Sequence, residues 1–178
     1  MTFNYSDRTA MKIPHTLITR LLAAALALTV LAGAHAASAQ RNGKALVGRV
    51  EPVSIPRFDL AMDARIDTGA RNCSLHAFNE KEVKAGGERF VEFSTLDAKN
   101  RVLRLKSKIV KVKTIRSTSG ATQRRFVIRE QVRLGGVQKE VFITLNDRSH
   151  LEYRFLVGRN LLRGHFIVDV SRSHVLAD

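Results

Sequence analysis

The stretch Ala64-Arg65-Ile66-Asp67-Thr68-Gly69-Ala70 places a carboxylate, a hydroxyl and a glycine directly after a run of alternating side chains. From position 58 to position 66, every second residue is apolar, so these side chains all fall on one face of an extended chain. A helix would scatter the same residues around its circumference. The pattern therefore predicts a half-buried strand that leads to Asp67, followed by a turn for which Gly69 supplies backbone freedom.

The rest of the chain predicts further strands joined by tight turns. Gly86-Gly87 and Gly135-Gly136 are typical of hairpin turns, and the small polar residues 117–122 predict the tip of a longer hairpin. The parity of the apolar side chains changes at Ile109-Val110, which predicts a bulge or a change of sheet. The predicted strands are residues 44–53 with a break at Pro52, then 58–67, 73–78, 89–95, 103–116, 124–133, 137–145, 155–157, 166–170 and 174–177, the last two as a hairpin. Residues 146–152 form either a short helix or a loop, and the whole predicts one small all-β barrel.

The N-terminal residues predict a secretory signal peptide over positions 1–39. Lys12 and Arg20 form a basic region, an apolar run follows at 21–34, and Ala37-Ser38-Ala39 is a small-residue cleavage pattern. Met11 is an alternative start. A retained membrane anchor is the competing interpretation, although the run is short beside the ~20 apolar residues that a span needs. We therefore expect a mature domain at 40–178 that is periplasmic or secreted and has no transmembrane segment.

The composition is strongly basic, with 30 Lys and Arg against 16 Asp and Glu. Removal of residues 1–39 leaves 27 basic and 15 acidic residues, a net charge of +12. Such a surface favours anionic partners, and for an exported protein these are acidic peptides, an anionic envelope or a membrane surface, and no nucleic acid. Cys73 is the only cysteine, so no disulfide can form within the chain.

A second motif lies near the C-terminus, where residues 155–162 read Phe-Leu-Val-Gly-Arg-Asn-Leu-Leu. Together with Asp-Thr-Gly, this motif resembles the retropepsin-like aspartic peptidases, in which the apolar strand supports the catalytic loop and Arg-Asn opens a short helix. The resemblance implies a small closed barrel with one short C-terminal helix. It implies catalytic roles for Asp67, Thr68 and Gly69. It implies supporting roles for Ala70, Ser74, Gly158, Arg159 and Asn160.

A closer resemblance extends over roughly residues 47–176. It rests on Ile66-Asp67-Thr68-Gly69-Ala70 with Ser74-Leu75-His76-Ala77, on Arg116-Ser117 with Gly120, on Leu145-Asn146-Asp147-Arg148-Ser149, and on Val157-Gly158-Arg159-Asn160 with Phe166-Ile167-Val168-Asp169. These segments are similar to a bacterial family labelled ATP-dependent zinc proteases and now regarded as retropepsin-like. Some relatives are associated with ATP-grasp ligases that add glutamates to proteins, which implies that acidic, glutamate-rich tails are removed.

The aspartic mechanism requires a second carboxylate. Two carboxylates held together share one proton, so the ionised one activates water and the protonated one donates to the peptide oxygen. The chain contains a single Asp-Thr-Gly, and no other Asp precedes Ser/Thr-Gly. The second Asp67 must come from another copy across a two-fold axis, where the resemblance implies that Thr68 braces its counterpart. A homodimer is therefore part of the hypothesis.

The two cofactors in the family label have little support in the sequence. No G-x-x-x-x-G-K-[ST] phosphate loop occurs, and no H-E-x-x-H occurs. Cys73 and His76 form a C-x-x-H pair, but they fall on opposite faces of their strand. The other candidate ligands, His150, His165 and His174, show no matching spacing. We expect no metal and no cofactor, with a zinc site built on Cys73, His76 and Asp67 as an alternative.

The candidate substrate-binding residues are Arg71, His76, Arg124 and Arg148, with Arg125 and Lys113 as further members of an acidic-substrate pocket. An ordinary buried histidine and solvated arginines on strand faces are the competing interpretations. Retroviral enzymes carry an acid at the position of Arg71, where it pairs with the Arg of Gly-Arg-Asn, so Arg159 needs a different partner here.

The flap, the mobile hairpin over the cleft, is assigned to residues 117–122, with Gly86-Gly87 as a rival. A non-catalytic module that binds an anionic envelope ligand on the same barrel, and a zinc hydrolase, are the alternative functions.

Overall fold

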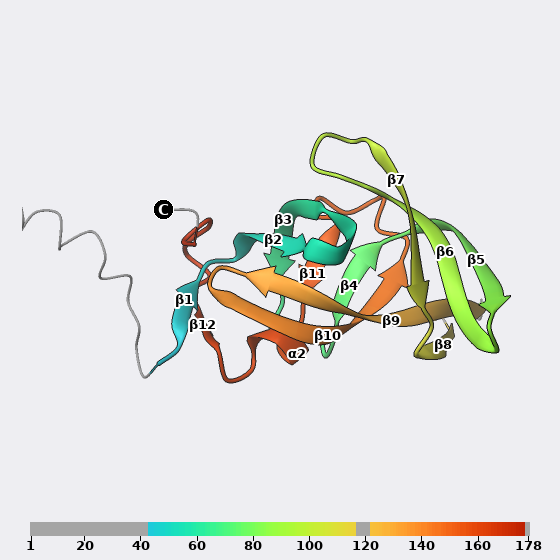
Figure 1. Ribbon diagram of the computed structural model, residues 1–178. Coiled ribbons are helices and arrows are strands. Elements are labelled where there is room, and N and C mark those ends of the chain that lie inside the picture. The colour runs from blue at the N-terminus through green and yellow to red at the C-terminus, as the bar shows by residue number, and fades with distance from the viewer. Residues whose placement is uncertain (1–42, 117–121, 177–178) are drawn as a thin grey trace, which may run out of the picture. The chain divides into compact units, whose positions relative to one another are not determined.

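The computed structural model describes residues 43–116 and 122–176. Within these ranges the chain forms twelve strands, one short 3-10 helix and one short α-helix (Figure 1). The strands are β1 (Ala45–Val47), β2 (Val50–Ile55), β3 (Leu60–Ile66), β4 (Cys73–His76), β5 (Phe78–Ala85), β6 (Glu88–Leu96), β7 (Val102–Lys108), β8 (Lys111–Arg116), β9 (Thr122–Leu134), β10 (Val137–Asn146), β11 (Phe155–Val157) and β12 (Phe166–Val168). The helices are η1 (Pro56–Phe58) and α2 (Arg159–Leu162). No helix among the described residues is both long and apolar enough to span a membrane.

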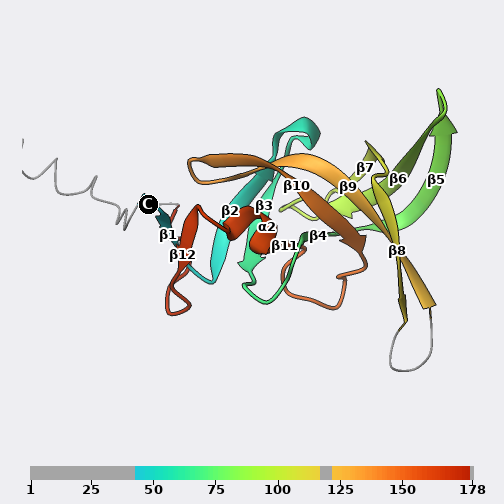
Figure 2. The same cartoon turned by 90° about the horizontal axis from the view of Figure 1, so that it is seen from below.

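Six strands close into a barrel in the order β10-β4-β11-β3-β2-β9, because β9 also pairs with β10. The β8–β9 hairpin extends beyond the barrel (Figure 2). Inward-facing aliphatic and aromatic side chains fill the barrel, and Ile55, Leu75, Ile128, Leu134 and Phe155 are completely buried or nearly so. The predicted all-β barrel with one short C-terminal helix is confirmed.

The strand before Asp67 has the predicted alternation. Leu60, Met62, Ala64 and Ile66 are buried, whereas the residues between them are exposed. Phe58 lies outside this strand, because Pro56 fixes the backbone angle that starts η1. The strand therefore begins at Leu60, two residues later than predicted.

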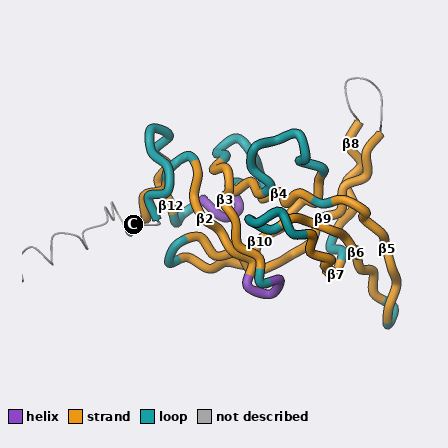
Figure 3. The backbone as a smooth tube through the Cα atoms, turned by 90° about the horizontal axis from the view of Figure 1, so that it is seen from above, coloured by secondary structure: helices purple, strands orange, loops and turns teal. Residues whose placement is uncertain are grey.

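A separate three-stranded sheet, β5-β6-β7, follows β4 in the chain (Figure 3). The predicted Gly86-Gly87 turn joins β5 to β6, with positive φ angles of 57° and 77° that glycine adopts without strain. The change of parity at Ile109-Val110 is a change of sheet, because β7 pairs with β6 and β8 pairs with β9. The β8–β9 and β9–β10 hairpins are confirmed, and of the predicted helix or loop at 146–152, Asn146 ends β10 and residues 147–152 form a loop. Of the assigned flap tip at 117–122, residues 117–121 lie outside the described residues and Thr122 begins β9.

The predicted C-terminal hairpin is wrong. β12 pairs in parallel with β1, with Ala45 opposite Phe166, and residues 174–176 form no strand. The fully buried Glu51 explains this, because its carboxylate accepts the backbone N–H groups of Val175 and Leu176, each at 3.0 Å. These donors are thereby removed from any ladder with β12.

The break in the first predicted strand is also misplaced. Pro52 lies inside β2, and the chain leaves β1 at Gly48. A Cβ at Gly48 would lie 2.5 Å from the carbonyl oxygen of Arg172, so the close approach of these two segments requires glycine there.

Candidate active site

Asp67 begins a tight turn at the end of β3. Its backbone N–H donates to the carbonyl of Val157 at 3.0 Å, which ties the turn to β11. Its Oδ1 accepts hydrogen bonds from the N–H groups of Gly69 (2.8 Å) and Ala70 (3.0 Å), the arrangement of an Asx turn. Oδ2 makes no hydrogen bond within the described part of the chain, so one carboxylate oxygen is left for chemistry.

The tip of this turn faces outward. Thr68 and Gly69 are exposed, and Asp67 is half-buried. A Cβ at Gly69 would lie 3.1 Å from Asp67 Oδ1, which is closer than side chains normally pack. Glycine at position 69 therefore lets the backbone N–H approach the carboxylate. The need for glycine comes from this close approach and not from the backbone angle, because φ at Gly69 is outside the left-handed region.

Gly158, Arg159 and Asn160 hold the Asp67 turn from behind, and we call these three residues the clasp. A Cβ at Gly158 would lie 2.5 Å from the backbone carbonyl of Asn72, so only glycine permits this approach. The backbone N–H of Arg159 donates to the carbonyl of Ala70 at 2.8 Å. These contacts join the two motifs that lie far apart in the sequence.

The guanidinium of Arg159 does not pair with an acidic residue, as the presence of Arg71 in place of the retroviral acid led us to expect. Its Nη1 donates to the carbonyls of Thr68 (3.0 Å) and Gly69 (2.6 Å), so the turn itself takes the place of an acidic residue. The adjacent Arg71 side chain is exposed and lines a groove described below. Charge-assisted hydrogen bonds to two successive carbonyls fix the turn.

Asn160 and Ser74 fasten β4 beside the turn. Asn160 Oδ1 accepts the backbone N–H of Cys73 at 3.0 Å, and its Nδ2 donates to the carbonyl of Phe142 at 2.8 Å. Ser74 Oγ donates to the carbonyl of Thr144 at 3.1 Å, which makes it a brace between β4 and β10. Both side chains therefore connect the barrel strands that surround Asp67.

His76, at the end of β4, contacts Arg148 in the loop after β10. His76 is buried, its Nδ1 accepts the backbone N–H of Arg148 at 2.9 Å, and burial lowers its pKa, while nearby Asp147 opposes the shift. Arg148 is buried too, and its Nε donates to the carbonyl of Tyr153 at 3.1 Å. Burial lowers the pKa of Arg148, and the negative charge of Asp67 counteracts this. Arg148 thus adds positive charge near Asp67, whereas His76 serves the packing of the loop.

The predicted acidic-substrate pocket does not come together as one cluster. Arg124 pairs with Glu82 at 3.2 Å, and Arg125 donates to Gln123. Both lie on β9, Arg124 exposed and Arg125 half-buried, which fits the competing interpretation of arginines on a strand face. Of the six predicted residues, Arg71 and Lys113 line one groove beside the Asp67 turn, whereas His76 and Arg148 contact each other elsewhere.

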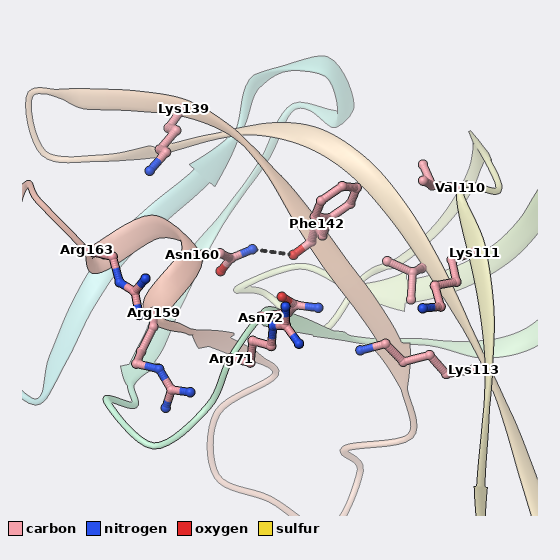
Figure 4. A pocket seen from close by; sticks show the side chains of 11 residues that line it. Arg71, Asn72, Val110, Lys111, Lys113, Lys139, Phe142, Arg159, Asn160 and Arg163 are labelled. Carbon is pink, nitrogen blue, oxygen red and sulfur yellow. Dashed lines mark hydrogen bonds between the residues drawn. The ribbon is translucent and has the colours of Figure 1, made fainter.

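That groove, which we call the cationic groove, has a volume of about 910 Å³ (Figure 4). β8 contributes Lys111 and Lys113 on one side, and Arg159 and Arg163 lie on the other side at α2. Its complete lining is Arg71, Asn72, Val110, Lys111, Lys113, Val127, Lys139, Phe142, Arg159, Asn160 and Arg163. Six of these residues are cationic and none is acidic, so the groove attracts anions.

Sequence reasoning missed most of the groove. Lys111 and Lys113 were detectable, because residues two apart on a strand share a face. Lys139 and Arg163 come from distant segments, and no local pattern in the sequence joins them to Arg71. The closure of the barrel brings them together.

The predicted zinc alternative does not fit the residues present. Cys73 Sγ is hydrogen-bonded to Asn160 Oδ1, and burial raises its pKa to about 11, which disfavours the thiolate that binds zinc. His76 Nδ1 already accepts a backbone N–H. Across the described ranges, no three His, Cys, Asp or Glu side chains are grouped as metal ligands.

The closed barrel, the outward Asp-Thr-Gly turn and the clasp define a retropepsin-like domain. The chain belongs to the RimB-like family, described as "Retropepsin-like aspartic endopeptidase RimB", whose family model matches residues 46–177. A solved structure of Lpg0085, a protein of unknown function from Legionella pneumophila, has the same fold. Its TM-score is 0.61 at 23% identity, over 72% of this chain and 95% of that one.

Curated relatives are longer proteins. A protein from Parasynechococcus marenigrum is 38% identical over 76% of this chain, and one from Shewanella pealeana is 36% identical over 77%. Both carry the name "Probable alpha-L-glutamate ligase". This chain spans 30% and 31% of their lengths, so the match concerns one part of each relative.

Proposed function

We propose that this protein is an exported, homodimeric aspartic endopeptidase that hydrolyses peptide bonds with Asp67 from each of two chains. The observation that carries the proposal is the Asp67 turn, in which two N–H groups bind one carboxylate oxygen and the other oxygen has no hydrogen bond from the described residues. Membership of the RimB-like family supports it, because that family's description names an aspartic endopeptidase.

The proposed reaction uses the turn as a rigid support. The N–H groups of Gly69 and Ala70 keep Oδ1 in place, so that Oδ2 faces a water molecule and the second Asp67. The ionised Asp67 takes a proton from water as the oxygen attacks the carbonyl carbon. The protonated Asp67 donates to the carbonyl oxygen, and a proton then passes to the leaving amine. Activity should show a bell-shaped pH profile, because one carboxylate must be ionised and one protonated.

Thr68 is proposed to brace the dimer at the two-fold axis, since its side chain lies exposed at the tip of the turn. Arg159 keeps that tip in position by binding the carbonyls of Thr68 and Gly69. A catalytic group displaced by 1 Å loses much of its effect, so this fixation has a direct catalytic value.

The proposed substrates are acidic, glutamate-rich peptides. The cationic groove supports this choice, since six basic side chains line it and begin next to the catalytic turn. Arg148 adds a further positive charge near Asp67. The names of the curated relatives point in the same direction, because a ligase for glutamate and a peptidase for glutamate-rich chains act on related chemistry.

The test is cleavage of a fluorogenic glutamate-rich peptide by the wild-type protein and by Asp67→Asn. Asparagine keeps an oxygen for the N–H groups of Gly69 and Ala70 but cannot ionise, so kcat should fall by at least ~10² to 10⁴. Asp63→Asn, which alters an exposed carboxylate on β3 just before the turn, is the matched control and should retain full activity.

Unchanged turnover in Asp67→Asn would end the proposal. Salt-sensitive binding of acidic peptide that survives Asp67→Asn, without cleavage by the wild type at any pH, would instead identify a binding module. The cationic groove is the feature that favours this second candidate.

A further inference from the structure

We propose that His76 is a positioning residue of the proposed peptidase, because its neutral ring holds Arg148 near Asp67 and its protonated ring releases Arg148. Acid would thus lower activity through a group outside the Asp67 pair. This inference rests on the proposed function and concerns the regulation of that site. The segment that responds is residues 147–153, between β10 and β11, which we call the Arg148 loop.

The two ends of the Arg148 loop are fixed to the end of β4. The backbone N–H of Ala77 donates to the carbonyl of Asn146 at 3.0 Å, and that of His76 donates to the carbonyl of Arg154 at 2.7 Å. Among the residues of the loop, all of which the structure describes, Arg148 alone is buried. The position of the middle of the loop therefore depends on the contacts of Arg148.

Arg148 makes one hydrogen bond through its backbone and one through its side chain. Its N–H donates to Nδ1 of His76 at 2.9 Å, and its Nε donates to the carbonyl of Tyr153 at 3.1 Å. The second bond closes the loop on itself, whereas the first attaches the middle of the loop to β4. The negative charge of Asp67 acts on the buried guanidinium, so the two charges interact. The bond at Nδ1 of His76 therefore keeps a cation near Asp67.

The bond at Nδ1 of His76 requires a neutral ring. A backbone N–H donates to a ring nitrogen that has a free lone pair, so the neutral ring carries its proton on Nε2. A second proton would occupy Nδ1 and convert it into a donor, which cannot bind the N–H of Arg148. The Oδ1 atom of Asp147 lies 3.6 Å from the same Nδ1 and is the acceptor for the protonated ring. One proton therefore exchanges Arg148 for Asp147 as the partner of the ring.

The surrounding charges determine the pH of this exchange. The charged groups that act on the ring or on its acidic neighbour come from the loop and its end, from β5 and from β9, and they are Asp147, Arg148, His150, Arg154, Glu80 and Arg125. Burial lowers the pKa of His76 below the ordinary 6.5, Asp147 opposes this shift, and the two nearby arginines add to it. Arg148 is thus held above pH 6.5 and released as the pH falls through the lowered pKa.

Release of Arg148 should slow the reaction because its charge is lost from the site. A cation near the Asp67 pair stabilises the negative charge that the pair and the attacked carbonyl share in the transition state. Small displacements of such groups reduce rates strongly, by about 10²-fold for 1 Å. The fall of activity on the acid side therefore has two causes, the titration of the Asp67 pair and the release of Arg148.

The experiment measures kcat for the fluorogenic glutamate-rich peptide between about pH 8 and pH 5. His76→Ala removes the acceptor and should lower kcat at neutral pH by about tenfold to a hundredfold. His76→Asn supplies an oxygen that accepts the N–H of Arg148 but does not titrate. It should restore most of the neutral-pH activity, and its kcat should fall about tenfold less than that of the wild type between pH 6.5 and pH 5.

Two further variants test the same exchange without altering the ring of His76. Asp147→Asn removes the charge that attracts the second proton, so the acid side of the pH profile should move to lower pH by about half a unit. His150→Asn changes an exposed histidine of the same loop and should keep the wild-type profile. Full activity in His76→Ala, a wild-type profile in His76→Asn or an unmoved acid side in Asp147→Asn would overturn the inference.

Failure of the proposed function is measured separately, by NMR titration of the wild-type protein without peptide. The ring signals of His76 and the backbone amide signal of Arg148 should shift together, with one midpoint below pH 6.5. If the wild type cleaves no peptide at any pH but this joint titration occurs, the peptidase proposal fails and the exchange of partners stands. If cleavage occurs and the amide of Arg148 does not follow the ring, the exchange fails and the peptidase proposal stands.

Discussion

The clasp and the cationic groove contain the same kinds of side chain, and Arg159 belongs to both. In the clasp, its guanidinium donates to two backbone carbonyls of the Asp67 turn. In the groove, Lys111, Lys113, Lys139 and Arg163 lie near one another without acidic partners among the described residues. The contrast shows that charge alone does not define a role. A cation satisfied by backbone oxygens holds the fold, whereas unpaired cations are available for a ligand.

The largest effect on stability is expected for Gly158→Ala in the clasp. The new Cβ would meet the backbone of Asn72 at 2.5 Å, and neither segment can move without disturbing the barrel. The free energy of unfolding should fall by about 3 kcal/mol, measured by urea denaturation. Gly136→Ala is the control, since nothing lies within 4 Å of its Cβ position. Its effect should stay within ~1 kcal/mol, and equal losses would contradict the close approach.

Arg159→Met should have the next largest effect. Methionine retains much of the side-chain length but loses the hydrogen bonds to the carbonyls of Thr68 and Gly69, at a cost of about 1.5 kcal/mol. Catalytic turnover should fall as well, since the turn loosens. Arg163→Met tests the contrast, because no side-chain hydrogen bond of Arg163 occurs in the described part of the chain. A stability loss as large in Arg163→Met would remove the distinction between clasp and groove.

A smaller, pH-dependent effect is expected from His76. Burial lowers its pKa below the ordinary 6.5, so the unfolded chain takes up the proton first as the pH falls. The stabilisation from this group is therefore complete above pH 6.5 and is lost as the pH falls below that value. His76→Asn should flatten the curve of melting temperature against pH between 6.5 and 5, whereas exposed His150→Asn should not. An unchanged slope in His76→Asn would refute this assignment.

The smallest effect on stability is expected in the groove. Lys111→Gln/Lys113→Gln removes two cations that form no ion pair in the described residues, so the free energy of unfolding should change by less than ~0.5 kcal/mol. Affinity for acidic peptides should nevertheless drop and lose part of its salt dependence. A stability loss comparable to that of Arg159→Met would assign these lysines to the fold.

Patterns local in the sequence predicted much of the barrel. The alternation in β3, the glycine turns and the change of sheet after Ile109 each depend on a few neighbouring residues. The prediction of a C-terminal hairpin was wrong because the structure there depends on a residue far away in the sequence. Glu51, more than a hundred residues earlier, binds the N–H groups of Val175 and Leu176, and no local pattern shows that contact.

The Asp67 turn was recognisable because the aspartic mechanism needs adjacent residues, and Arg159 was recognisable by its motif. The partners of its guanidinium could not be predicted, because every residue has a backbone carbonyl and the sequence does not distinguish one from another. The same limit applies to the groove, where Arg71, Lys139 and Arg163 meet only after β4, β10 and α2 have packed together.

The most direct test of the shared site is activity in mixed dimers. Wild-type and Asp67→Asn chains are refolded together in equal amounts, and cleavage of the fluorogenic glutamate-rich peptide is compared with wild type at the same total concentration. If both Asp67 residues are needed, only wild-type homodimers act, and activity should fall to about one quarter. A fall to about one half would show that each chain works alone and would contradict the shared pair.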